Sequence, residues 1–181
     1  IPQGTLFTDS SGNSWLSARD VTWYSNVTTC KVPIVQHEKY TASALNNMVI
    51  PTGDRVIIHL GTLPNGKYYE QGSMSLQIGG ETWVLVDTFA KSKPTDKHFM
   101  VSVDEALNPY IMFGDGTFGK KPAAGAKITN VVFYLTNGTQ GNVKSNTITS
   151  VPSVISSSIT DATVSNAYDA GGGSNYENFT M

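Results

Sequence analysis

The chain has 181 residues, with 12 basic and 14 acidic side chains and a formal net charge of −2. This length predicts one domain of ordinary size with a substantial core. The low, balanced charge argues against a nucleic-acid partner, because phosphate binding needs a clustered excess of Lys and Arg. No apolar run approaches the roughly 20 residues that span a bilayer, so no membrane segment is expected.

The single cysteine, Cys30, excludes a disulfide within the chain and is expected to act as a small hydrophobic side chain. The chain opens with Ile1-Pro2, without a recognisable signal peptide. It stops at Met181, where Tyr176 to Phe179 resembles the start of a new element. We therefore expect a fragment of a longer polypeptide.

Helix signals are weak, and strand signals dominate. Ala42 to Met48 is compatible with one short helix, and no later segment before the C-terminus sustains a helical apolar stripe. Met74, Leu76 and Ile78 alternate with polar residues, which places these three side chains on one buried face. We expect a mainly β fold of antiparallel, sandwich-like sheets, with strands at 56–60, 73–78, 82–87, 98–104, 110–113 and 128–135.

The run from 128 to 135 is apolar on both faces and is expected to be a central or doubly covered strand. Its alternating sets are Ile128, Val132 and Tyr134 on one face and Thr129, Val131 and Phe133 on the other. Gly79-Gly80 predicts a tight hairpin. Residues 104–107 allow one helical turn, but Pro109 and the flanking strands favour a hairpin loop.

Composition changes after Asn142, where Ser and Thr become frequent and apolar residues become sparse. We expect a β domain over residues 1–144. Residues 145–181 are expected to form an extended arm and a glycine-rich joint that leads to a further C-terminal domain. The widely spaced Ile and Val residues indicate that the arm packs on this domain or on a neighbour.

A glycine-rich segment from 114 to 125 is the most informative part of the sequence. Glycine accepts positive φ and proline fixes φ, so a specific folded loop is encoded. Asp115 is expected to cap its turn; a calcium loop would need further acidic residues. The spacing Gly-x-Gly-x-x-Gly also matches a dinucleotide fingerprint, but the required helix is missing. The predicted structural residues are Gly114, Asp115, Gly116, Gly119, Pro122 and Gly125.

No catalytic, metal-binding or cofactor-binding set stands out. His37, His59 and His98 lack metal-ligand spacing. A glycosidase pair would have to come from carboxylates that no pattern singles out: Asp87, Asp96, Asp104, Glu81 and Glu105. The three tryptophans, Trp15, Trp23 and Trp83, are either core residues or a sugar platform.

Four segments together resemble a known family. They are Ile1-Pro-Gln-Gly-Thr-Leu-Phe7, Phe113-Gly-Asp-Gly-Thr-Phe-Gly-Lys-Lys-Pro-Ala-Ala-Gly125, Tyr134 followed by Gly141-Asn142-Val143, and Val164-Ser-Asn166 before Gly171-Gly-Gly173 and Glu177. They resemble the J-like baseplate wedge proteins of contractile-tailed phages. In that family, Val35-Gln-His-Glu38 would correspond to a Gln-Gly-Glu step, with His37 departing from it.

The resemblance implies a structural role. It predicts a non-enzymatic component of a phage tail baseplate, located in the virion and made in the host cytoplasm. Its partners would be other wedge proteins and copies of itself, oligomeric in the assembled particle, with no cofactor. Gly141 and Asn142 would belong to the structural loops. Two alternatives stay open: a carbohydrate-binding or adhesin module, and a hydrolase acting on cell-wall polymer.

Overall fold

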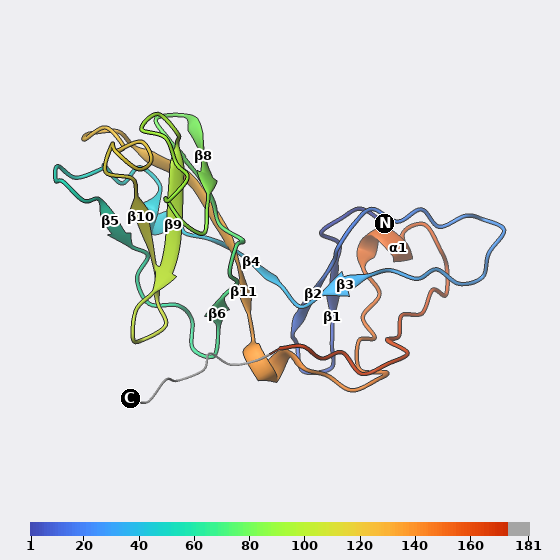
Figure 1. Ribbon diagram of the computed structural model, residues 1–181. Coiled ribbons are helices and arrows are strands. Elements are labelled where there is room, and N and C mark those ends of the chain that lie inside the picture. Colours follow the sequence, from blue (N-terminus) through green and yellow to red (C-terminus); the bar gives the residue numbers. More distant parts are fainter. Residues whose placement is uncertain (174–181) are drawn as a thin grey trace. The chain divides into compact units, whose positions relative to one another are not determined.

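The computed structural model describes residues 1–173, which form two compact units (Figure 1). One unit combines residues 1–38 with the segment that starts at Thr136, and the other contains residues 39–135. Strands are the main regular structure of the described chain, and most strand pairs are antiparallel, which confirms the expected mainly β fold. We call these the terminal unit and the central unit, and each is described by itself.

The central unit is built on one eight-stranded sheet that curls into a half-barrel. Its order is β4-β11-β7-β8-β9-β10-β5, and β6 also pairs with β11. Strands β8 and β9 are parallel, whereas β7 pairs antiparallel with both β8 and β11, and β10 with both β9 and β5. The strands are β4 (Glu38–Thr41), β5 (Ile57–His59), β6 (Tyr68–Tyr69), β7 (Ser75–Ile78), β8 (Glu81–Leu85), β9 (His98–Val103), β10 (Pro109–Phe113) and β11 (Ile128–Thr136).

The core of the central unit lies on the concave face of this sheet. Met74, Leu76 and Ile78 are all buried, as their alternation predicts. Trp83 packs edge-to-face on Phe113, with ring centroids 5.4 Å apart. Such aromatic pairs stabilise a core by about 0.5–1.5 kcal/mol beyond the burial of their area. The expected sandwich-like packing thus takes the form of a single sheet curled over its own core.

Strand β11 contains a bulge that the alternation does not reveal. The register against β7 shifts between Thr129 and Val132, and Asn130 has φ of 54°. An extra residue in a strand reverses the direction of every later side chain. Core-facing positions in β11 are therefore Ile128, Val131, Phe133 and Leu135, each with no exposed surface. The expected grouping of Ile128 with Val132 and Tyr134 is wrong beyond Asn130 for this reason.

The predicted turns form where glycine accepts a positive φ or where a short polar side chain binds the backbone amides of the turn. Gly79 and Gly80, with φ of 59° and 80°, connect β7 to β8. Between β9 and β10 the chain makes a hairpin loop and no helical turn, and the Asp104 carboxylate accepts hydrogen bonds from the Ala106 and Asn108 amides. The expected helix at 42–48 is reduced to a 3₁₀ turn, η1 (Ser43–Leu45).

The terminal unit has a smaller sheet with the order β1-β2-β3. Its elements are β1 (Leu6–Thr8), β2 (Ser14–Ser17), β3 (Ile34–Val35), η2 (Gly138–Gly141) and α1 (Ser153–Ser156). Phe7 and Trp15 from the sheet pack with Ile148 and Ile155 from the later segment. Residues 145–173 therefore share a core with the N-terminal strands, whereas the sequence suggested a boundary at residue 144. The last residue of the expected glycine-rich joint, Ser174, and the C-terminal domain expected after it lie outside the described residues.

Asp9 is the buried carboxylate of the terminal unit. Its Oδ1 accepts hydrogen bonds from the Ser11 and Asn13 amides at 2.8 and 2.9 Å. Its Oδ2 accepts from Asn13 Nδ2 at 2.9 Å and Trp15 Nε1 at 3.1 Å. Burial raises the pKa of Asp9, but the hydrogen bonds from Trp15, Asn13 and Ser11 outweigh it, and the net pKa lies below the ordinary value of 3.8.

A first prediction concerns the bulge. Asn130→Val should lower the free energy of unfolding by about 1–2 kcal/mol, because a β-branched residue is strained at positive φ. Asn130→Gly is the matched control, since it also removes the hydrogen bond from Asn130 Nδ2 to Gln77 Oε1 but accepts this backbone. Urea denaturation should show a clearly larger loss for valine. Equal losses would contradict a backbone origin.

A second prediction concerns acid. Because the folded pKa of Asp9 is depressed, its contribution to stability is fully present above the unfolded pKa of about 3.9 and is lost as pH falls through the folded value. Asp9→Asn puts an amide donor opposite the donors of Asn13 and Trp15. We expect this variant to be less stable than the wild type at pH 7, with a difference that shrinks below about pH 4. Chemical denaturation across pH measures it, and a pH-independent difference would refute it.

Candidate functional site

The glycine loop, residues 114–125, has a tightly specified backbone. Asp115 caps it, because its Oδ1 accepts hydrogen bonds from the amides of Thr117 and Phe118 at 2.7 and 2.9 Å. Those two amides, Phe118 first, lower the pKa of Asp115 against a small opposing effect of desolvation. The Asp115 carboxylate therefore stabilises the turn in which it lies, as aspartate does in many tight turns.

Two glycines of this loop are in close contact. A Cβ on Gly114 would lie 2.4 Å from the carbonyl carbon and oxygen of Gly119, which no real side chain tolerates. Gly119, with φ of 82°, also faces the ring of Phe89. The next amide, on Lys120, donates to the Asp96 carbonyl at 2.7 Å and ties the loop to the neighbouring connection.

The remaining predicted loop residues have distinct roles. Gly116 and Gly125 adopt φ of 94° and 84°, and the Gly125 amide donates to the Ile50 carbonyl at 2.9 Å. Pro122 is buried, whereas Phe118 is 53% exposed. The loop is thus a rigid backbone structure that presents one aromatic side chain to solvent.

Gly141 and Asn142, at the end of η2, belong to the terminal unit, whereas the glycine loop belongs to the central unit. Gly141 is buried, and a Cβ there would approach Gln36 Oε1 to 2.6 Å. Asn142 clasps the backbone of Gly173 with two hydrogen bonds: its Nδ2 donates at 3.0 Å and its Oδ1 accepts at 2.9 Å. The side-chain amide of Asn142 therefore makes the two hydrogen bonds with Gly173 that the backbone of a neighbouring strand would otherwise make.

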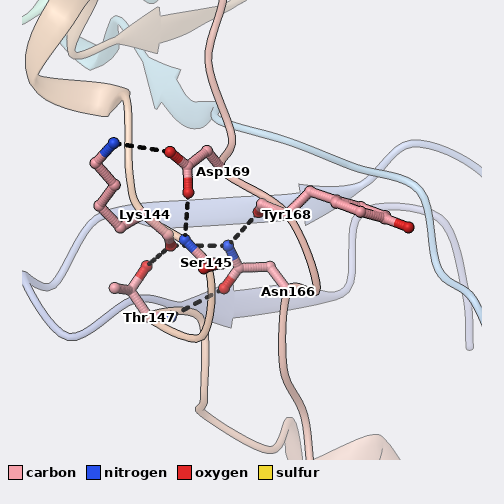
Figure 2. Close-up of polar contacts among 6 residues, drawn as sticks. All are labelled: Lys144, Ser145, Thr147, Asn166, Tyr168 and Asp169. Carbon is pink, nitrogen blue, oxygen red and sulfur yellow. Dashed lines mark hydrogen bonds and ion pairs between the residues drawn. The ribbon is translucent and has the colours of Figure 1, made fainter.

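A second clasp joins the two strand-like segments 143–148 and 164–170 (Figure 2). The Asn166 Oδ1 accepts from the Thr147 and Ile148 amides at 3.0 and 2.9 Å, while its Nδ2 donates to the carbonyls of Lys144 and Tyr168. Val143 and Ala170 exchange both backbone hydrogen bonds. We call this arrangement the Asn166 clasp.

Asp169 completes the Asn166 clasp at the surface. It accepts from the Ser145 amide at 2.9 Å and pairs with Lys144 Nζ at 2.8 Å. The hydrogen bond to Lys144, with the Ser145 amide, lowers the pKa of Asp169. Between these anchors the Tyr168 side chain points away from the polar cluster and is 83% exposed (Figure 2). Sequence reasoning treated this region as an arm and missed the clasp, because no local pattern shows which amide meets which peptide.

The remaining sequence candidates are dispersed. His37 lies in the terminal unit, and His59 and His98 lie on β5 and β9 of the central unit. His98 Nδ1 is 2.8 Å from the hydroxyl of Ser92, which is itself buried. Trp15 and Trp83 are buried in the cores of the terminal and central units, and Trp23 is half-buried against the first core, so the rings of Trp15 and Trp83 present no open face to a sugar.

Across residues 1–173, no group of three or more His, Cys, Asp or Glu side chains is placed to hold a metal ion. None of the helical segments described has the length and apolar character needed to cross a bilayer. Comparison with protein-family models, curated proteins and solved structures gave no match.

A third prediction separates the two reasons for glycine in the loop. Gly114→Ala should destabilise the protein by about 3 kcal/mol or more, because the added methyl group collides with the Gly119 backbone. Gly125→Ala meets open space and should cost only about 1–2 kcal/mol through its positive φ. Thermal and urea unfolding of both variants would test this order. The reverse order would show that the Gly114–Gly119 contact is not required.

Proposed function

We propose that this chain is a structural module of a contractile phage tail baseplate that acts through protein–protein surfaces. The sequence resemblance supports the choice of this assembly. The structure supports the mode of action through its loops and clasps, whose polar groups bind the chain's own backbone. Asp115, Asn142 and Asn166 all follow this pattern.

The observation that carries the proposal is an exposed apolar row on the convex face of the central sheet. Ile57, Met112 and Met100 are directly opposite one another on β5, β10 and β9. Val84 on the adjoining β8 is opposite His98, two residues before Met100, and therefore lies diagonally beside the row. Ile57 and Val84 are 45% and 54% exposed, and both methionines are half-buried.

A row of this kind suits a protein partner. Burial of apolar surface drives most protein association, and the flexible methionine side chain adapts to an opposing surface. Tyr110 and His59 form a second cross-strand pair beside the row, with ring centroids 5.4 Å apart. In the proposed role, a neighbouring baseplate protein or another copy of this chain covers these strands.

A fourth prediction tests the proposal. Val84→Glu should weaken complexes with the products of the genes adjoining its own, or with other copies, at least about tenfold, because the charge would be buried in the contact. Its fold should be unaffected, since Val84 is exposed. Thr82→Glu, an exposed position two residues away on the same strand, is the matched control.

Sedimentation velocity and electron microscopy of the reconstituted complexes would measure the effect. Loss of assembly with Val84→Glu but not with Thr82→Glu supports the proposal. A wild-type chain that stays monomeric and binds none of those gene products would refute it. Glycan-array binding by such a monomer would instead favour the carbohydrate-binding alternative.

A further inference from the structure

A depression of about 350 Å³ opens on the central unit, beside the C-terminal end of β8. Its apolar wall comes from Leu85, Val86 and Val101, and its polar part from Tyr69, Gln71 and Asp87. This volume lies at the lower end of the range of about 300–1,000 Å³ that is typical of small-molecule sites. Every lining residue belongs to the same unit, so the depression exists within one compact body.

The polar groups at its rim are available. Asp87 and Gln71 are both exposed, and neither side chain has a hydrogen bond or ion pair within residues 1–173. Asp87 differs in this from Asp9, Asp115 and Asp169, whose carboxylates are all occupied by other groups of the chain. The depression thus combines an aliphatic wall with one unpaired negative charge.

We propose that this depression receives an arginine side chain from a partner protein. Arginine has an aliphatic stem that packs along apolar surface and a planar cation that binds a carboxylate through two parallel hydrogen bonds. The wall of Leu85, Val86 and Val101 fits the stem. Asp87 fits the guanidinium group, and the Gln71 carbonyl oxygen offers it a further acceptor.

Other ligand classes fit the lining less well. Anions are disfavoured, because the only charged side chain in the lining is a carboxylate. A metal ion would need more ligands than one carboxylate provides. A saccharide would find no exposed aromatic face, since the ring of Tyr69 is buried to all but 4%. Charge complementarity therefore favours an arginine side chain, which combines an aliphatic stem with a positive charge.

This inference rests on the proposed function, because it names the chemistry of one partner contact. Its test is nevertheless independent of assembly. Nα-acetyl-arginine amide is titrated into the protein and followed by NMR, with Nα-acetyl-citrulline amide as the uncharged analogue of the same shape and methyl glucoside as the sugar probe. Arginine should shift the methyl signals of Leu85, Val86 and Val101, and citrulline should bind at least about tenfold more weakly.

The variant Asp87→Asn should reduce arginine binding at least about tenfold without changing the melting temperature, since the exposed Asp87 side chain makes no hydrogen bond or ion pair within residues 1–173. Glu105→Gln, which makes the same charge change in the exposed β9–β10 loop, should bind like the wild type. Equal binding of arginine and citrulline, shifts elsewhere on the protein, no shifts, or a preference for methyl glucoside would each overturn the inference.

The assembly experiment distinguishes the two proposals. If wild type and Asp87→Asn form equally strong complexes and the arginine probe does not bind, the arginine contact is wrong and the structural role stands. If the arginine probe binds at this depression but no complex forms with other copies or neighbouring gene products, the structural role is wrong and the site stands.

Discussion

The central unit depends on the bulge at Asn130. Strand β11 pairs with β4, β6 and β7, so its side chains decide what the concave face of the sheet contains. With the extra residue, Val131, Phe133 and Leu135 join Ile128 in the core. Without it, Val132 and Tyr134 would point inward and three fully buried side chains would face solvent. Asparagine suits this position because its short polar side chain tolerates positive φ.

In the terminal unit, much of the backbone lies outside regular strands and needs other hydrogen-bond partners. Its three strands are short, and residues 143–173 contain few regular hydrogen bonds of their own. Side-chain amides take the place of neighbouring strands: Asn166 binds four backbone groups, and Asn142 binds both polar groups of Gly173. Because a carboxamide has the donor and acceptor of a peptide group, it satisfies backbone that would otherwise need a ladder. This allows a Ser- and Thr-rich segment to pack with only a few apolar anchors such as Ile148 and Ile155.

These two mechanisms explain which features the sequence could predict. Gly79-Gly80 specifies its hairpin through local φ preferences, and Met74, Leu76 and Ile78 specify a face through period two; both need only neighbouring residues. The phase of β11 could not be predicted, because apolar side chains occupy both of its faces and the pattern is equally hydrophobic in either register. The union of residues 1–38 with the later segment was also hidden. It arises from long-range contacts, such as the hydrogen bond from the Thr8 amide to Ser150 Oγ, that no local pattern records.

In the glycine loop, the residues that fix the backbone differ from the residue whose side chain is most exposed. Its glycines are required by backbone geometry: Gly114 by its contact with Gly119, and Gly116 by its positive φ. The side chain that this geometry exposes to solvent is Phe118, which no glycine constraint specifies. A loop already fixed by Asp115 and by the Lys120–Asp96 hydrogen bond loses little conformational entropy when Phe118 is covered. Within the proposed role, the signature residues therefore make association easier by rigidity, while the identity of the partner is decided by exposed residues around them.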